Sequence, residues 1–547
     1  MTALDQIRTR GAATPQNRQA DVRQVKNNAG GFTFTIPGED RIRRFLTIGT
    51  EAGTFYVERR GLTAENGGVV LDWARNRPAD LVRLAAEISA AGRAPRNDPA
   101  ILAVMAAMAL GDTEGRQAAE RAFTEVVRTG THLFAAAKFT EQFRGWGAIA
   151  RRAFARWYLD KDADELAYQL VKYRQRHDWT HLDVLRSAHS TKDADQAHRD
   201  LFNWLAKGRT ERDPLPSWVR AYERAREIER TAEKKARTVH YLQLIRDFPG
   251  LPWEVLPDEA HSNAEVLGAL VDAGMPQTAL IRQLPTLTRL GVLPPMSARL
   301  RAVCEQIADP ARLIKARVHP LAVLIALRTY ARGQSLRGST RWVPEQMLCD
   351  ALSEAFYGAF GAVEPSGQRT MLCTDISGSM GWPIYDPSDP RERKLLYPFT
   401  AAEIVGAMAM VTARFEPAWG IYGFATHLRP LAISPRMRLD EVMRVMFSAY
   451  GGGTNCSAPM TWALQNKVEV DVFTSYTDNE TWWGGIHPHQ ALENYRQGMG
   501  IDASMQVVAV AANEFSIANP DDPRQLDVSG FDSAVPQLLA DHARGTA

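Results

Sequence analysis

The sequence predicts an α solenoid of stacked helix pairs followed by a doubly wound α/β domain, and three observations lead to this prediction. From about Asn66 to Phe360, apolar residues recur at three- and four-residue spacing, and short Gly, Pro or Asp clusters separate the segments. Beyond Gly367, short apolar strands alternate with helical segments. The chain has 547 residues, which is more than one hydrophobic core usually accommodates.

We divide the chain into three segments. Residues 1–29 are polar and have no apolar stretch of the kind found in a signal peptide, so we expect a disordered leader. Residues 30–365 form the helical module, which is too long for one simple bundle and fits HEAT-like repeats. Its pattern does not distinguish a closed ring from an open arc. Two short strands, 31–35 and 53–57, are expected near its start.

The charge is divided unevenly between these segments. The net charge is +2, but residues 1–365 carry roughly +9 and residues 366–547 roughly −7. A basic module favours a polyanionic partner, whereas an acidic one favours metal or protein chemistry. The four cysteines form no CxxC pair, which indicates a reducing compartment and a cytoplasmic protein. The apolar runs are too short to predict a membrane span.

The C-terminal segment alternates strands and helices in an order typical of a parallel sheet with its site at the carboxyl ends of the strands. The expected strands are 370–374, 419–424, 470–476 and 505–510, and the expected helices are 401–411 and 439–446.

Hard oxygen donors stand at those strand ends. Asp375, Ser377 and Ser379 alternate along one loop, Thr454 follows three glycines, and Asp478 ends another strand. Carboxylates and hydroxyls suit Mg²⁺ or Mn²⁺ and suit zinc or copper poorly. The five positions resemble the metal-ion-dependent adhesion site of von Willebrand factor A domains. We therefore predict one divalent cation, Mg²⁺, at these residues.

A serine hydrolase is the competing interpretation of this loop. Ser379 lies between a strand and a helix, and Asp478 and His487 follow in hydrolase order. The strained turn of a nucleophile elbow needs glycine two residues before the nucleophile, where this chain has Ser377. We therefore assign no catalytic residue.

Basic residues cluster in the helical module. Lys172, Arg174 and Arg176 are read as the end of one helix, with Lys172 and Arg176 on a shared face. A capping box at Thr180–Asp183 starts the next helix, on which Arg186 and His189 share a face. Two basic faces on consecutive helices would form a phosphate-binding ledge.

Aromatic residues alternate with arginines just before this cluster. Trp146, Phe154, Trp157 and Tyr158 could stack on unpaired bases, but aromatics in a solenoid usually belong to its core, and we prefer that interpretation. The run 220–237 mixes Glu with Arg and Lys and is expected to be a salt-bridged surface helix.

Nearly the whole chain, from about Gly30 to Phe531, resembles the Ro ribonucleoprotein autoantigen family and in particular its bacterial members, whose defining module is called TROVE. The matching segments are Arg43-Arg44-Phe45-Leu46, Lys172-Tyr173-Arg174-Gln175-Arg176, Trp179-Thr180-His181, Leu185-Arg186 with His189, His319-Pro320, Leu324-Ile325-Ala326-Leu327, Leu336-Arg337-Gly338, Thr477-Asp478-Asn479-Glu480 and Pro520-Asp521-Asp522. The leader and the segment 385–390 lie outside the match.

The resemblance implies a ring of HEAT-like repeats closed by a von Willebrand factor A domain. It implies a non-catalytic, monomeric protein that binds small non-coding Y RNA on its outer surface, through Lys172, Arg176 and His189. It also implies that single-stranded 3′ ends of misfolded or immature RNA enter the central hole, in cooperation with a 3′→5′ exoribonuclease. Two alternatives remain open: a protein-adhesion module that captures a partner's carboxylate at the metal, and a metal-dependent RNA-cleaving enzyme.

Overall fold

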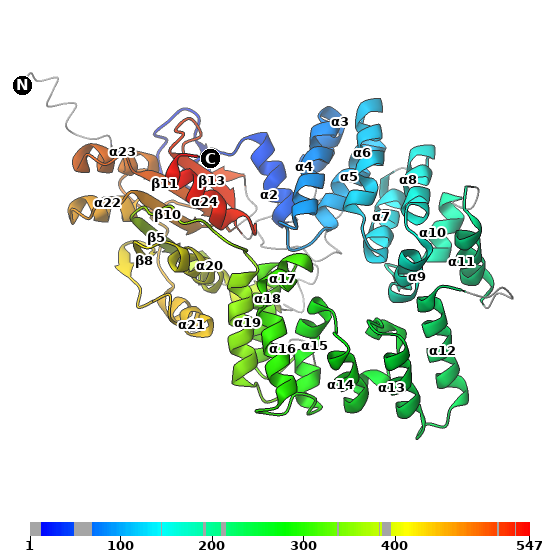
Figure 1. Cartoon of the computed structure of the whole chain (residues 1–547). Helices are drawn as coiled ribbons and strands as arrows, with labels where there is room; N and C mark the ends of the chain where they lie inside the picture. The colour runs from blue at the N-terminus through cyan, green and yellow to red at the C-terminus, as the bar shows by residue number, and fades with distance from the viewer. Residues whose placement is uncertain are drawn as a thin grey trace, which may run out of the picture.

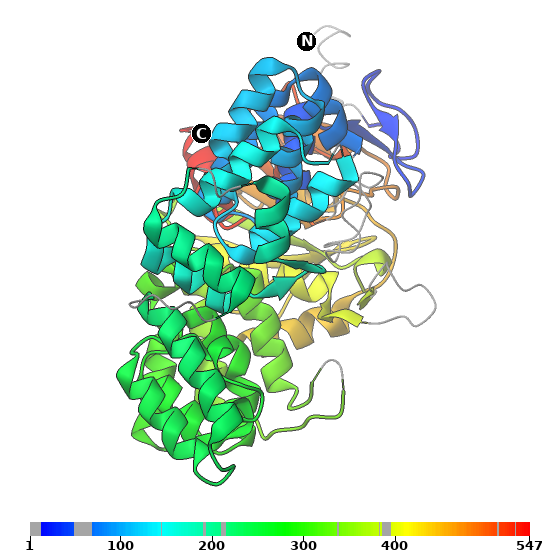
Figure 2. The same ribbon diagram turned by 90° about the vertical axis from the view of Figure 1, so that its right-hand side faces the viewer.

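The protein folds as a long arc of helices that returns onto an α/β domain, so that the two parts close a ring (Figure 1). This computed structural model describes residues 13–48, 68–143, 145–189, 193–208, 215–335, 338–381, 383–385, 395–510, 514–530 and 532–546. In the view turned by 90°, the cyan and green helices lie in front and the yellow elements of the α/β domain show behind them (Figure 2). No helix among the described residues is long and apolar enough to cross a membrane.

The helical module stacks each helix on neighbours close to it in the chain, as a solenoid does. Its helices are α2 (Gly38–Ile48), α3 (Gly68–Asn76), α4 (Pro78–Ala91), α5 (Asp98–Leu110), α6 (Thr113–Val126), α7 (Gly130–Phe143), α8 (Ala148–Leu159), α9 (Ala163–Lys172), α10 (His181–Ala188), α11 (Gln196–Lys207), α12 (Ser217–Thr231), α13 (Arg237–Asp247), α14 (Ala264–Asp272), α15 (Gln277–Arg289), α16 (Ala298–Ala308), α17 (Pro310–Lys315), α18 (Pro320–Ala331) and α19 (Gln346–Gly358). Two short 3₁₀ turns, η1 (Trp253–Val255) and η2 (Ala260–Ser262), join α13 to α14.

Helix α5 shows why the solenoid holds together. Its sequence is almost entirely apolar, and residues from Asp98 to Met108 are buried. Helices α3, α4, α6 and α7 pack around it, so it is enclosed by its neighbours. Pro99 in its first turn and Gly111 directly after its last residue mark its two ends.

The α/β domain contains a six-stranded sheet in the order β13-β11-β10-β5-β8-β9. The strands are β5 (Thr370–Asp375), β8 (Trp419–Phe424), β9 (Leu428–Pro430), β10 (Val472–Thr477), β11 (Ser504–Ala509) and β13 (Gln525–Ser529). All pairs are parallel except β8 with β9, which is antiparallel. The doubly wound parallel sheet is therefore confirmed, with an antiparallel edge strand that the sequence reading omitted.

Helices cover both faces of this sheet. They are α20 (Ala401–Phe415), α21 (Leu439–Ala449), α22 (Ala458–Gln465), α23 (Pro488–Met499) and α24 (Val535–Arg544). Alternate residues of β5 enter two separate apolar cores, Leu372 on the side of α20 and Met371 and Cys373 on the side of α22 and α23. A 3₁₀ turn, η3 (Gly378–Gly381), follows β5, and a two-stranded ribbon, β6 (Pro383–Tyr385) with β7 (Leu395–Thr400), leads into α20.

The N-terminal segment belongs to the α/β domain, so the prediction of a disordered leader is wrong for residues 13–29. Strands β1 (Val25–Lys26), β2 (Phe32–Thr35) and β12 (Phe515–Ser516) form a small sheet. Gln16 is buried, and its amide donates to the side chains of Asn455 and Ser457 and to the carbonyl of Ile486. This segment is polar because hydrogen bonds, not apolar contacts, hold it in place. Residues 1–12 and the strand predicted at 53–57 lie outside the described residues.

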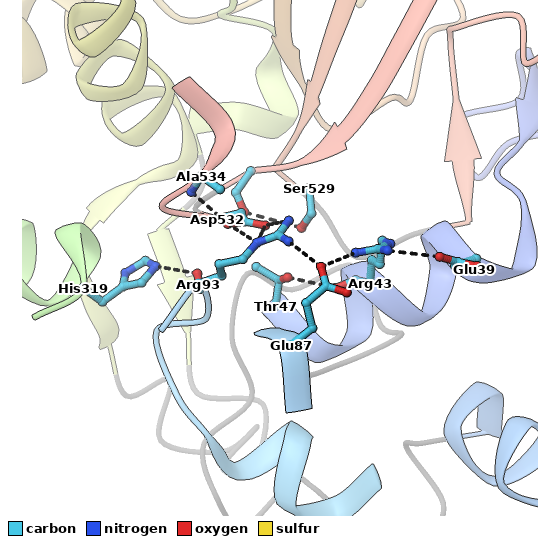
Figure 3. A network of polar contacts seen from close by, with 10 residues as sticks. Glu39, Arg43, Thr47, Glu87, Arg93, His319, Ser529, Asp532 and Ala534 are labelled. Atoms are coloured by element: carbon cyan, nitrogen blue, oxygen red, sulfur yellow. Dashed lines mark hydrogen bonds and ion pairs between the residues drawn. The ribbon is translucent and has the colours of Figure 1, made fainter. Parts of the chain in front are cut away.

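The ring closes where α2, α4 and α18 meet the α/β domain. The Arg44 guanidinium forms an ion pair with Asp527 of β13, and Arg93, after α4, forms one with Asp532 at 2.5 Å. The Arg93 carbonyl lies 3.1 Å from Nε2 of His319, which caps α18. Figure 3 shows the contacts around Arg93, which join both ends of the helical arc and the α/β domain.

Candidate functional site

The loop after β5 brings its oxygen donors together as predicted. Asp375 is buried at the end of β5, where its Oδ1 accepts from the Ser377 backbone N–H at 2.8 Å. The Ser379 hydroxyl lies 3.1 Å from that of Ser377 and donates to Asp478 Oδ2 at 2.8 Å. Four of the five predicted metal residues thus meet at one edge of the sheet.

The fifth residue, Thr454, lies in a loop that is fastened to the same place. Gly451 donates to the Ile376 carbonyl at 2.7 Å, and Gly378 donates to the Gly452 carbonyl at 3.0 Å. Gly451 and Gly452 have φ of 139° and 96°, which a residue with a side chain rarely adopts. Thr454 is buried and lies two residues beyond this attachment. The glycines therefore let the threonine loop approach the serine loop closely.

Thr477 is a site residue that the sequence reading missed. Its hydroxyl donates to Asp375 Oδ2 at 2.7 Å, and it directly precedes Asp478 at the end of β10. The signal in the sequence was that Thr477 directly precedes Asp478, a predicted metal ligand.

The two carboxylates destabilise each other's charged form. Burial, and then the charge of Asp478, raises the pKa of Asp375 to about 7, and burial raises the pKa of Asp478. A divalent cation would relieve this repulsion. No three His, Cys, Asp or Glu side chains cluster as metal ligands among the described residues, so such a cation would depend on the serine and threonine hydroxyls. This all-oxygen set fits Mg²⁺.

The geometry excludes the hydrolase triad. His487 is buried, and its two ring nitrogens lie 2.8 Å from the Arg18 carbonyl and 3.3 Å from the Gln24 amide. The Ser379 hydroxyl bonds to Asp478 and not to a histidine. Among the described residues, Ser379 therefore lacks the histidine partner that this triad requires.

The basic cluster has a different shape from the one predicted. Helix α9 ends at Lys172, and Gln175–Arg176 (β3) pairs with Trp179–Thr180 (β4) in a hairpin whose turn residues, His177 and Asp178, have φ of 56° and 65°. Lys172 and Arg176 therefore do not share a helix face. The positive φ values define the tight turn, and two-residue strands are too short to give a sequence period.

The hairpin and α10 present the basic side chains to solvent. Arg174, Arg176, Arg186 and His189 are exposed, while Lys172 is half-buried and its ammonium donates to the Tyr168 hydroxyl at 3.1 Å. His189 caps α10 with φ of 53°, one residue beyond the helix. The capping box predicted at Thr180 and Asp183 is confirmed. We call Lys172, Arg174, Arg176, Arg186 and His189 the basic ledge.

Two tyrosine rings lie against cationic side chains of the basic ledge. The Arg174 guanidinium lies 4.3 Å from the centre of the Tyr222 ring, and the Lys172 ammonium lies 5.1 Å from that of Tyr168. Neither tyrosine was predicted from the sequence. Tyr222 lies on α12, far from Arg174 in the chain, and Tyr168 lies one turn before Lys172 on α9. Phe154, Trp157 and Tyr158 are fully buried, and Trp146 is half-buried against the same core, so the prediction of a core role is confirmed.

Two family models and two related proteins together match nearly the whole chain. It matches the family model described as TROVE domain over residues 25–252 and 250–329, and the model described as Ro60 vWA domain over residues 369–543. It is 38% identical to the RNA-binding protein RO60 of Deinococcus radiodurans, over 97% of each chain. It is 31% identical to the RNA-binding protein RO60 of Caenorhabditis elegans, over 95% of this chain and 90% of the other.

The fold agrees with these matches. The crystal structure of the Deinococcus radiodurans RO (RSR) protein aligns with a TM-score of 0.69 and 35% identity, covering 93% of this chain and all of that one. The resemblance predicted from the sequence is thereby confirmed. The chain belongs to the Ro60 family, in which a TROVE domain is followed by a Ro60-type von Willebrand factor A domain.

Proposed function

We propose that this protein is a non-catalytic RNA-binding protein and that the basic ledge is its main contact with RNA. The observation behind the proposal is that five cationic or ionisable side chains converge on one hairpin and one helix end. No acidic side chain of the described chain forms an ion pair with any of the five. They are therefore available to bind phosphate groups, and contacts with phosphate are the main source of affinity for RNA.

The proposed RNA is a structured small RNA of the Y class, bound on the outer surface. Within the same proposal, single-stranded 3′ ends of misfolded or immature RNA enter the ring, and a 3′→5′ exoribonuclease acts on what is presented. The relatives are named RNA-binding proteins, which supports the general part of the proposal. The ring closes within one chain, which favours a monomer.

The test changes Lys172, Arg176 and His189 together to alanine and measures affinity for a labelled small structured RNA by filter binding. We expect a loss of at least about 100-fold, because each charged contact contributes roughly 1.5 to 3 kcal/mol. A matched control changes His240, Arg301 and Lys315, which are exposed residues of the same three types elsewhere in the helical module. Equal affinity in the two triple variants would refute the assignment of the ledge.

We propose further that Asp375, Ser377, Ser379, Thr454 and Asp478 hold Mg²⁺. The cation would neutralise the buried carboxylates and join the β5, β10 and glycine loops. With two carboxylates in the site, and with His487 bonded to Arg18 and Gln24 instead, the arrangement supports a binding or structural role over hydrolysis. Incubating the purified protein with labelled single-stranded RNA and Mg²⁺ tests this, because cleavage products would contradict the non-catalytic proposal.

A second candidate function is capture of a protein partner's carboxylate at the metal. It is favoured by four exposed aromatic residues, which are Phe447 near the end of α21, Tyr450 directly after that helix, and Trp482 and Trp483 in the loop after β10. Exposed aromatic side chains are frequent anchors of protein interfaces. EDTA separates the two functions, since it would abolish protein capture and leave RNA binding at the distant ledge unchanged.

A further inference from the structure

A pocket lies at the seam where the helical arc closes on itself, apart from both the basic ledge and the metal residues. Its volume is about 460 Å³, and its walls come from the α4–α5 loop, α15, the segment before α18, and α18 itself. In Figure 1, α17 and α18 lie where the arc returns towards its first helices. The Arg93–His319 contact joins these elements beside the pocket.

The charged side chains that line the pocket are cationic. Arg96, Arg282 and Arg317 line it, and no Asp or Glu is among the described residues that do so. Arg282 and Arg317 are exposed. Burial, together with the charge of Arg317, lowers the pKa of nearby Arg128 to about 10. Arg282 and Arg317 come from two separate elements, α15 and the α17–α18 turn, and together they give a concave surface complementary to an anion.

The arginine from the α17–α18 turn is held in position by its surroundings. A Cβ placed at Gly92, the left-handed cap of α4, would lie 3.5 Å from three side-chain carbons of Arg317. The aliphatic part of Arg317 thus packs along the end of α4, and its guanidinium is left for the pocket. His319 adds no charge, since its Nδ1 accepts the backbone N–H of Leu321 at 3.1 Å.

The remaining wall is apolar, with isolated hydrogen-bonding groups. Ile281, Pro285, Leu321 and Ile325 contribute hydrocarbon surface. Pro285 lies inside α15 and has no N–H, so the Ile281 carbonyl lacks its usual helical donor. The Thr329 hydroxyl is buried and makes no hydrogen bond within the described part of the chain. A ligand here would meet cations on one side and apolar surface with a few polar groups on the other.

We propose that this pocket binds a nucleotide, with its phosphate on Arg282 and Arg317 and its base against the apolar wall of α15 and α18. Guanidinium groups match phosphate oxygens in pairs, and pockets of this size and mixed lining are typical of small-ligand sites. The same chemistry is offered by a free nucleotide and by the phosphorylated terminal nucleotide of an RNA. The proposal does not depend on RNA binding at the basic ledge.

The experiment titrates the full chain with AMP, adenosine and inorganic phosphate by calorimetry. We expect AMP to bind more tightly than either fragment. Arg282→Gln and Arg317→Gln should each weaken AMP binding by about 10- to 100-fold, as the loss of one charge-assisted contact implies. Arg289→Gln is the matched control, because Arg289 is exposed on the same helix and does not line the pocket.

A second variant tests the cavity itself without changing its charge. Ala322 is exposed and lines the pocket, so Ala322→Phe fills the space while leaving the arginines in place. We expect AMP binding to be lost while the unfolding temperature stays unchanged. AMP affinity that is equal to that of inorganic phosphate, or unaffected by Ala322→Phe and both glutamine variants, would overturn the proposal.

Competition identifies the source of the nucleotide. If a 5′-phosphorylated pentanucleotide displaces AMP and its 5′-hydroxyl counterpart does not, the pocket holds an RNA terminus; if neither does, it holds a free nucleotide. The variant of Lys172, Arg176 and His189 should retain full AMP binding. The experiments therefore test RNA binding at the basic ledge and nucleotide binding in the pocket separately.

Discussion

The Arg93 guanidinium contacts the Asp532 carboxylate through two nitrogens, with Nη2–Oδ2 and Nε–Oδ2 distances of 2.5 and 2.8 Å. The two residues are 439 positions apart and join the end of α4 to the turn before α24. Asp532 is 4% exposed, so its charge depends on this partner. Glu87 of α4 also contacts Arg93 and Arg43, which connects the pair to α2 (Figure 3).

Arg93→Ala should destabilise the closed ring by about 3 kcal/mol, because it leaves the buried Asp532 carboxylate without its partner. The free energy of unfolding in urea measures this loss. The control is Arg83→Ala, since Arg83 is exposed and its ion pairs are 3.8 and 3.9 Å long. It should cost less than about 0.5 kcal/mol. Similar losses in both variants would show that the closure pair contributes little.

In EDTA, the free energy of unfolding should fall as the pH rises from about 4 to 7. The pKa of Asp375 is about 7 in the folded protein and near 4 in the unfolded chain, so the folded state binds the extra proton in this window. The loss of stability is absent at pH values below the pKa of Asp375 in the unfolded chain, and it is complete above the pKa of Asp375 in the folded protein. We expect a change on the order of 4 kcal/mol, at about 1.4 kcal/mol for each pKa unit. Asp375→Asn should flatten the profile, and a variant that keeps the slope would contradict this origin.

Mg²⁺ should raise the unfolding temperature of the native protein at pH 7.5 and leave that of Asp375→Asn unchanged. Binding to the folded state alone stabilises by about 2.7 kcal/mol at a concentration 100 times the Kd. Ser379→Ala should weaken the response while preserving the fold, since Ser379 is a partly exposed donor at the rim. Ca²⁺ at the same concentration serves as the comparison cation. A Mg²⁺ response that is identical in Asp375→Asn would place the cation elsewhere.

Gln16→Ala should lower the affinity for Mg²⁺ although Gln16 is not a predicted ligand. Its side-chain amide contacts Asn455, beside Thr454, and its carbonyl accepts from Thr481, three residues after Asp478. It therefore braces both loops that bring metal donors to the site. We expect a loss of several-fold in Mg²⁺ affinity and about 2 kcal/mol in stability. Asn17→Ala, at an exposed neighbour, is the control, and equal Mg²⁺ affinities would exclude a positioning role.

The sequence predicted those parts of the fold in which each segment carries its own pattern. The strand 419–424 and the first residue of the helix at Ala401 were located to the residue, because apolar runs and a capping box mark them. The proximity of the proposed metal ligands was predictable for the same reason, since Asp375 and Asp478 stand at the ends of recognisable strands and Thr454 follows a glycine run. What failed was the leader, which is held by hydrogen bonds from Gln16 across more than 400 positions.

The hairpin at Arg176 could not be predicted for a different reason. Two residues in each strand give no alternation, and its turn uses His177 and Asp178 where Asn-Gly would be the recognisable signal. The closure contacts Arg44–Asp527 and Arg93–Asp532 leave no local pattern at all. Such contacts depend on how the whole arc curves, which is the sum of many small rotations between neighbouring helices.

The salt dependence of RNA affinity distinguishes direct phosphate contacts from indirect effects of the ledge. Each phosphate neutralised by a protein cation contributes about 0.7 to 0.9 to the slope of log affinity against log salt concentration. Arg176→Ala and Lys172→Ala should therefore each reduce the slope by roughly that amount, and the double variant by about twice as much. Arg301→Ala, at an exposed arginine of α16, should leave the slope unchanged. If affinity falls in the ledge variants while the slope stays at its native value, Arg176 and Lys172 support the hairpin and do not themselves touch phosphate.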